Sequence, residues 1–238
     1  MLGNYITVDG VSSRTLGLFC KQLPMYPVAV RGMNAITVGG RLEDLYQSAD
    51  HYADFQIDIE AVLIGFDMDP VIRYFSAGKR LVLSNIPDRY AVIRQLVAID
   101  QQRVGNGALE LKITLKCSPF KHKIANDPII CTQSPHYFRT SGTIYSEPVI
   151  VVTGCSSSFT MELNGTQFSI SGLSGDVYVD VPNRVAYQFD DQYNQVVVLD
   201  HTSGNIWDLL LVPSDIKYNA LTFSGADAVE ITPNERWL

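Results

Sequence analysis

The residues best suited to chemistry are two cysteines and two histidines in the middle of the chain. Cys117 lies five positions before His122, and Cys131 lies five positions before His136. Two thiolates and two imidazoles could complete a tetrahedral zinc site. The spacing is not that of a zinc finger, however, and a lysine stands on each side of His122. We therefore expect a buried cysteine at a strand end, solvated histidines and no metal ligands.

A nucleophilic hydrolase of the α/β type would carry its serine in a Gly-x-Ser-x-Gly run. Residues 171–175 (SGLSG) only approximate that run, and they stand where a β-turn is expected. The histidines show no recognisable order of serine and acid partners; they are His51, His122, His136 and His201. We expect no catalytic triad.

Paired carboxylates could hydrolyse glycosides, and two pairs are available, Asp190 with Asp191 and Asp176 with Asp180. Acids in turns are usually solvated, so we expect no glycosidase here. Residues 38–41 (VGGR) lack the remaining glycines and the lysine of a nucleotide-binding loop. These observations together predict a protein that is not an enzyme, with no catalytic residues and no cofactor.

Aromatic side chains offer a different function, because exposed rings can stack against sugars. Trp207, Tyr187 and Tyr193 are the candidates. Rings of this kind more often pack in a core or in cross-strand pairs. Sugar binding by these three residues is therefore kept as a second interpretation.

The two halves of the chain differ sharply in charge. The 238 residues are 46% hydrophobic, enough for one large domain or two of ordinary size. Up to Tyr137 the formal charge is +1, whereas from Phe138 onward it is −8. This break suggests two domains, residues 1–137 and 138–238. The acidic half lacks the clustered lysines and arginines that nucleic-acid phosphates require.

Cysteine usage and hydropathy indicate where the protein is made. Four widely spaced cysteines do not resemble the dense pattern of a secreted disulfide scaffold. The opening MLGNYITVDG has neither the basic nor the apolar region of a secretory signal. No apolar run approaches the roughly 18 residues of a membrane span. We expect a protein made in the cytoplasm, with no membrane partner.

In the first half, apolar and polar residues alternate as they do in half-buried strands. Strands are expected at residues 55–61, 81–84, 90–99 and 109–116. Asp69 and Pro70 are expected to begin a short helix, and Gly78 to end it. Pro119 is expected to end the last strand, because proline cannot donate to the ladder. A single helix among many strands argues against a doubly wound α/β enzyme.

Residues 121–146 contain two prolines and little periodicity, and are expected to form a linker. Asn164-Gly165 beyond it is a strong hairpin signal. The second half is dense in short apolar segments separated by turn residues, which is typical of an antiparallel sandwich. The expected strands are residues 149–153, 159–163, 166–170, 177–181, 185–189, 196–199, 206–212, 220–223 and 229–231.

These segments, in this order, resemble the distal tail (Dit) proteins of long-tailed bacteriophages. Residues 10–18 (GVSSRTLGL) are similar to the opening of that family, where an apolar strand leads into Gly-x-Ser-Ser and then Leu-Gly-Leu. Residues 38–41 resemble its next segment, and residues 117–120 (CSPF) its Cys-x-Pro-Phe close of the first domain. Residues 145–150 (YSEPVI) and 219–225 (NALTFSG) resemble parts of its second domain.

The resemblance covers nearly the whole chain, and it is weaker over residues 124–143. At residues 213–215 (PSD) the chain departs from the family's Pro-Gly-x-Asn. The family implies a ring-forming first domain, usually hexameric, and a peripheral galectin-like or carbohydrate-module-like sandwich. Such a ring joins the tail tube and tape measure proteins to the tail-tip and baseplate proteins. The sugar-binding residues of galectins match no run here, so the resemblance does not imply sugar binding.

We therefore interpret the chain as a mainly β structural virion protein of a phage tail. Residues 1–137 would form the ring domain with one short helix, and residues 138–238 the outer antiparallel β-sandwich. Its partners would be its own copies and the tail proteins named above. The alternative is a carbohydrate-binding adhesion module that recognises a bacterial surface polymer. A ring needs heterologous contacts, which we expect from the amphipathic strands of the first half. Trp237 and Leu238 are expected to dock on the sandwich or on the first domain.

Overall fold

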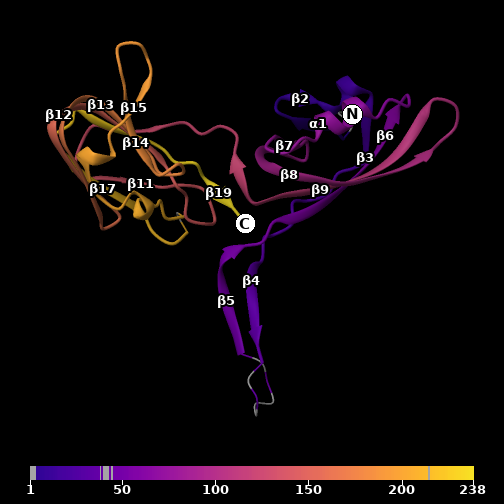
Figure 1. Cartoon of the computed structure of the whole chain (residues 1–238), viewed down its shortest axis with the longest axis horizontal. Helices are drawn as coiled ribbons and strands as arrows, with labels where there is room; N and C mark the ends of the chain where they lie inside the picture. The colour runs from indigo at the N-terminus through magenta and orange to yellow at the C-terminus, as the bar shows by residue number, and fades with distance from the viewer. Residues whose placement is uncertain (1–3, 38, 40–42, 44, 214) are drawn as a thin grey trace. The chain divides into compact units, whose positions relative to one another are not determined.

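The computed structural model describes residues 4–37, 39, 43, 45–213 and 215–238 (Figure 1). The chain groups into two compact units, Met1–Ile124 with Leu238, and Ala125–Trp237. No helix within the described ranges is long and apolar enough to cross a membrane.

Seven antiparallel strands of the first unit form one sheet in the order β2-β1-β7-β8-β9-β6-β3. Their bounds are β1 (Ile6–Val8), β2 (Val11–Ser12), β3 (Leu18–Gln22), β6 (Phe55–Ile64), β7 (Arg80–Leu83), β8 (Ile86–Arg103) and β9 (Ala108–Lys123). A 3₁₀ turn, η1 (Ser13–Leu16), joins β2 to β3. The alternation predicted for β6 and β9 is confirmed, because every second side chain of β6 from Phe55 to Leu63 is buried.

The helix α1 (Asp69–Tyr74) packs Val71 and Tyr74 into the same apolar core as the sheet. Its start differs from the expectation. Asp69 lies inside the first turn and is not the cap; the carboxylate of Asp67 instead accepts a hydrogen bond from the Asp69 N–H at 3.1 Å. The helix also ends at Tyr74, before Gly78 is reached.

The expectation that Pro119 ends its strand is wrong. Strand β9 continues to Lys123, and the ladder with β8 absorbs the proline in a bulge. Residues 118–120 lie opposite Val92 alone, and the Val92 N–H donates to the Ser118 hydroxyl at 3.3 Å instead of to a backbone carbonyl. The missing proline N–H therefore leaves no gap in the ladder, as is usual for proline at bulges.

A separate two-stranded sheet leaves the first unit as a hairpin of β4 (Arg31–Ile36) and β5 (Leu45–Tyr52). Figure 1 draws it in purple, running away from the seven-stranded sheet of its own unit. The sequence did not predict these strands. The VGGR run joins them, and apart from Gly39 it lies outside the described residues.

The second unit contains β10 (Ile129–Cys131), β11 (His136–Phe138), β12 (Val149–Leu163), β13 (Thr166–Asp180), β14 (Val185–Phe189), β15 (Gln195–Val197), β16 (Thr202–Gly204), β17 (Asn219–Ser224), β18 (Ala228–Thr232) and β19 (Arg236–Trp237). Short 3₁₀ turns follow β15 and β16, namely η2 (Leu199–His201) and η3 (Ile206–Asp208). The predicted Asn164-Gly165 turn joins β12 to β13, and both residues have the positive φ that such a turn requires.

Strands β12 and β13 form one long hairpin, and each strand pairs with two different neighbours along its length. The first part of β12 pairs with β18 and its last part with β17; β13 likewise pairs with β16 and then with β14. Irregular register and the positive φ values of Ser157 and Gly172 mark the bend between the two parts. Side chains from both halves of the hairpin share one core, including Ile150, Phe159 and Val179.

The predicted fold class, mainly β with two antiparallel units, is confirmed, with a single α-helix among the residues described. Two local expectations for the second half are wrong. Residues 206–212 form η3 and an isolated bridge at Leu211, not a strand. The expected linker contains β10 and β11, which pair with β18 and β17 of the second unit. The division at residue 137 stays a prediction.

Candidate functional site

The four residues of the possible zinc site belong to different parts of the fold. Cys117 is buried in the first unit, and Cys131 is buried in the second. His122 stacks on Tyr90 with ring centroids 5.3 Å apart, and His136 lies tilted beside Phe138. The described part of the chain contains no group of three or more His, Cys, Asp or Glu placed to hold a metal ion.

Burial makes the two thiols poor nucleophiles. It raises the pKa of Cys117 to about 12, with a smaller contribution from Asp54, and the pKa of Cys131 to about 11. The thiolate is the reactive form of cysteine, and these groups stay protonated at neutral pH. They act as small apolar core residues.

The SGLSG run lies in the bent middle of β13, where it meets His201. The His201 Nδ1 is 2.9 Å from the backbone carbonyl oxygen of Ser171, not from its hydroxyl. Asp200 approaches the other ring nitrogen at 3.9 Å and is largely exposed. A triad needs the histidine on the serine hydroxyl. This geometry therefore fixes a turn and does not activate a nucleophile.

The paired carboxylates also hold turns. Asp190 accepts hydrogen bonds from the backbone N–H groups of Gln192 and Asn194, each at 2.8 Å. The bonds from Asn194 are the main reason that the pKa of Asp190 is lowered. Asp176 accepts from the Gly154 N–H, and Asp180 from the Asn183 N–H. None of these three is arranged as an acid–base pair across a cleft.

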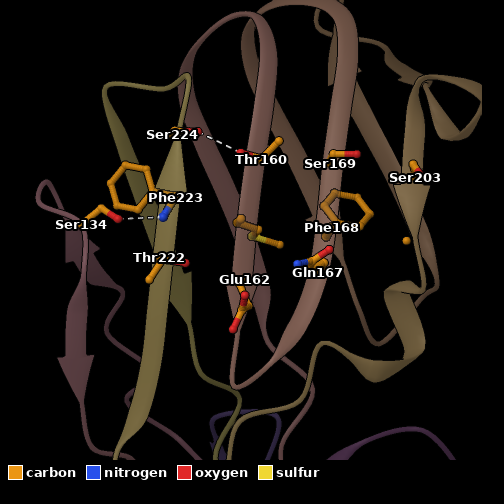
Figure 2. A pocket seen from close by; sticks show the side chains of 12 residues that line it. Ser134, Thr160, Glu162, Gln167, Phe168, Ser169, Ser203, Thr222, Phe223 and Ser224 are labelled. Carbon is orange, nitrogen blue, oxygen red and sulfur yellow. Dashed lines mark hydrogen bonds between the residues drawn. The ribbon is translucent and has the colours of Figure 1, made fainter.

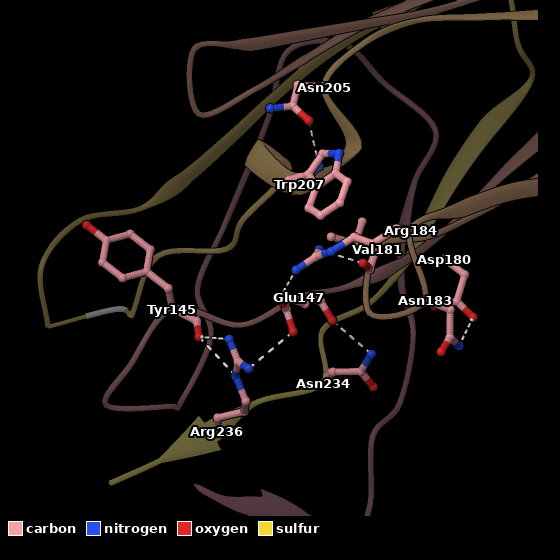
Figure 3. Close-up of polar contacts among 10 residues, drawn as sticks. All are labelled: Tyr145, Glu147, Asp180, Val181, Asn183, Arg184, Asn205, Trp207, Asn234 and Arg236. Atoms are coloured by element: carbon pink, nitrogen blue, oxygen red, sulfur yellow. Dashed lines mark hydrogen bonds and ion pairs between the residues drawn. The ribbon is translucent and has the colours of Figure 1, made fainter. Parts of the chain in front are cut away.

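The three aromatic candidates for sugar stacking do not form one platform. Tyr187 stacks on Tyr178 with centroids 5.2 Å apart, and Tyr193 is 86% exposed at the β14–β15 turn. Trp207 is also exposed, but the Arg184 guanidinium covers its ring at 5.2 Å from the centroid (Figure 3).

Arg184 is held over Trp207 by an ion-pair network centred on Glu147. One carboxylate oxygen of Glu147 pairs with Arg184 at 2.5 Å and the other with Arg236 at 3.2 Å. Arg236 also donates to the Tyr145 carbonyl at 2.6 Å, and Asn234 donates to the Glu147 carbonyl (Figure 3). The network joins three separate segments of the second unit. Its role is structural.

The first unit exposes an unusual series of apolar side chains on β4 and on the segment before it. We name this surface the apolar arm; its members are 45–69% exposed and are Met25, Val28, Val30, Met33 and Ile36. Two side-chain hydrogen bonds hold the beginning of this segment, at residues 26 and 27. The Tyr26 hydroxyl donates to the Leu81 carbonyl at 2.8 Å, and Lys121 donates to the Pro27 carbonyl at 3.1 Å. A series of exposed apolar side chains of this kind is typical of an interaction site.

The second unit carries an open cavity of about 560 Å³ on the outer surface of β17, β12, β13 and β16 (Figure 2). We name it the polar groove. Strand register places its outward side chains in two rows. One row consists of Ser224, Thr160, Ser169 and Ser203, and the other of Thr222, Glu162 and Gln167.

Neither the apolar arm nor the polar groove was predicted from the sequence. The arm lies in a stretch without clear periodicity, and its one visible signal was the number of apolar residues in a proline-containing segment. The groove consists of common polar residues from four strands. The amphipathic strands expected to supply a ring contact instead turn their apolar sides into the core of their own unit.

No protein-family model matches the chain, and no curated protein matches it. The fold nevertheless has known counterparts among solved structures, and it defines the chain as a two-unit antiparallel β protein. One similar structure is the crystal structure of the SPP1 Dit protein (gp 19.1), described as a paradigm of the hub adsorption apparatus in phages that infect Gram-positive bacteria. The TM-score is 0.75 at 13% identity, covering 99% of each chain.

Proposed function

We propose that this protein is a structural component of a phage tail, a distal hub that joins the tail tube to the tail-tip or baseplate proteins. The observation that carries the proposal is the similarity in fold to a hub adsorption protein along the whole of both chains. An unrelated protein that shared only a common sandwich would match one unit alone. The sequence motifs resemble the same family independently of the fold.

The apolar arm supports an assembly role. A closed ring requires that one surface of each subunit meet a different surface of the next. The arm supplies five exposed apolar side chains, and covering them in a subunit contact would remove their apolar surface from water. We infer that the arm contacts the neighbouring copy of this chain, and that the ring is a hexamer.

The proposal includes no catalysis. The sequence-predicted nucleophile, histidine and carboxylate candidates have structural hydrogen bonds that explain them without a reaction. Tail tube, tape measure and baseplate proteins are the proposed partners, and the virion tail is the proposed location.

Mass measurement in solution tests the proposal. The purified full chain, alone at high concentration or with a tail partner, should form a closed species of six 26.4 kDa subunits. Negative-stain images should show a ring with a central opening. A chain that stays monomeric with tail tube and baseplate proteins present would exclude the hub.

A further inference from the structure

The polar groove is a built feature of the second unit. Its floor is formed by the outer surface of β12 and β13, and both strands are paired on each side along this stretch. The backbone groups of the floor are therefore already hydrogen-bonded. A molecule in the groove can interact only with side chains, which register holds about 4.8 Å apart from strand to strand.

Several of these side chains are available for a ligand. The side chains of Glu162, Gln167 and Thr222 are exposed and form no hydrogen bond or ion pair with any other residue that the structure describes. The side chains of Ser169, which is half-buried, and Ser203, which is exposed, also form none among the described residues. Thr160 and Ser224 are paired with each other at 2.8 Å. A carboxylate only accepts hydrogen bonds, whereas amide and hydroxyl groups can both donate and accept them.

This inventory matches a molecule that carries many hydroxyl groups. Neighbouring hydroxyls of one sugar can both donate hydrogen bonds to the Glu162 carboxylate. The Gln167 amide can accept a hydrogen bond from one hydroxyl and donate a hydrogen bond to another. The Phe223 ring lies at one rim beside Ser134 and is half-buried, so it offers apolar contact at the edge (Figure 2). The spread of donors and acceptors over two rows suits a chain of sugars more than a single small molecule.

Other ligand classes match less well. The lining includes no lysine, arginine or histidine, so phosphates and nucleic acids would meet a carboxylate and no cation. Peptides bind mainly by pairing with a sheet edge or by placing apolar side chains in a groove. The floor here is not an edge, and its apolar members Met161 and Phe168 are almost fully buried.

We propose that the polar groove binds a neutral glycan, with Glu162 and Gln167 as the central hydrogen-bonding residues. The site differs from the aromatic residues that the sequence pointed to, none of which lines the groove. The proposal does not depend on ring formation. It would give a tail hub a direct contact with a surface polysaccharide.

The test uses the full chain and a panel of neutral gluco-, galacto-, manno- and rhamno-oligosaccharides printed as an array. A glycerol-phosphate polymer and a sialylated oligosaccharide serve as anionic comparisons. Binding to at least one neutral oligosaccharide is expected, and isothermal titration then measures its affinity. Absence of binding to every neutral member, or stronger binding to the anionic polymers, overturns the proposal.

Three variants locate the site. Glu162→Gln keeps the shape and removes the charge, and should weaken binding roughly tenfold. Thr222→Val should weaken it less, and Ser169→Trp should fill the groove and abolish binding. Glu230→Gln is the matched control, since Glu230 lies on β18 outside the groove. Thermal unfolding checks that each variant is folded.

The expected pattern is full binding by the Glu230→Gln control, reduced binding by Glu162→Gln and none by Ser169→Trp. Undiminished binding by folded Ser169→Trp would overturn the proposal. The mass of the assembly should be unchanged in all four variants, so a failure of the groove and a failure of the hub give different results.

Discussion

The two units solve the same problem of burying a β-sheet, but they leave opposite surfaces. Each buries its alternating apolar side chains in its own core. The first unit then exposes a second set of apolar residues on the arm, whereas the second unit exposes hydroxyl, amide and carboxylate groups in the groove. The first surface suits permanent contact with another protein, and the second suits reversible contact with a hydrated ligand.

Charge follows nearly the same division, since residues 125–137 of the second unit carry one formal charge, that of Asp127. The sequence up to Tyr137 is nearly neutral, and the remainder carries −8. Near-neutral subunits can pack closely without strong self-repulsion, whereas an acidic unit stays solvated and resists close association. Assembly and recognition can therefore be assigned to separate parts of one chain. Variants of each part test its assignment separately.

The largest effect is expected from the apolar arm. Replacing Val30 and Met33 together by aspartate places two charges in the proposed subunit contact, which should convert the ring to monomers. The control is Val197→Asp, which changes an apolar residue of β15 in the second unit that is also more than half exposed. Analytical ultracentrifugation should find the control still assembled. Rings that persist in the double variant would show that the arm is not the contact.

The next largest effect is expected from proteolytic cleavage between the two units. Limited proteolysis should cut within residues 121–146, most readily at residues 124–128, which form no strand. Mass spectrometry should identify a folded, acidic C-terminal fragment. A first cut inside β12–β18 would contradict the two-domain division. Retention of β10 with the C-terminal fragment would place the boundary before residue 129.

The Glu147 network should contribute more than an ion pair of the first unit. Glu147→Ala leaves two partly buried arginines without their carboxylate, and we expect a loss of about 2–3 kcal/mol in the free energy of unfolding. Lys112→Met is the comparison. It breaks a pair with Asp58 in which both side chains are about half exposed, and should cost less than about 1 kcal/mol. Denaturant titration measures both; equal losses would contradict the ranking.

The elements that could be predicted from the sequence are those whose cause is local. Alternation in β6 follows from burial of one side, and the Asn164-Gly165 turn follows from residues that tolerate positive φ. The continuation of β9 through Pro119 could not be predicted, because the bulge depends on the opposite strand, where the Val92 N–H donates to the Ser118 hydroxyl. The strand expected at residues 206–212 is absent, and its absence could not be predicted because a short apolar run does not distinguish a strand from buried turns.

The surfaces could not be predicted, for a related reason. Glu162 and Gln167 lie on either side of a turn, and Thr222 joins them only through strand pairing 60 residues later in the chain. Each of these residue types is common on any exposed strand. The arm differs again, since its exposure depends on which apolar residues the core leaves out. Both surfaces are properties of the register and packing, and no local pattern predicts which residues belong to them.

The smallest of the expected effects is a difference between the two units in their stability at alkaline pH. Burial raises the pKa of Cys117 to about 12 from 9.0, so the folded state favours the neutral thiol. This contribution is complete below pH 9 and is lost as the pH rises from 9 toward 12, at a cost of about 2 kcal/mol by pH 10.5. Cys131 loses a similar amount. Burial also raises the pKa values of Cys20, Tyr26 and Tyr74 in the first unit and of Cys155 and Tyr187 in the second, but the large tyrosine shifts belong to the first unit.

The first unit should therefore unfold first as the pH is raised. Trp237 lies on β19, which pairs with β9 of the first unit, so the measurement uses a Trp237→Phe variant. The remaining Trp207 belongs to the second unit and its fluorescence reports that unit, whereas circular dichroism reports both. At pH 10.5 the thermal transition seen by circular dichroism should begin at a lower temperature than the transition seen by tryptophan fluorescence. Cys117→Val removes the ionisable thiol and should lose less stability between pH 8 and pH 10.5 than the unsubstituted chain. If the two signals change together at both pH values, the difference in alkaline stability between the units does not exist.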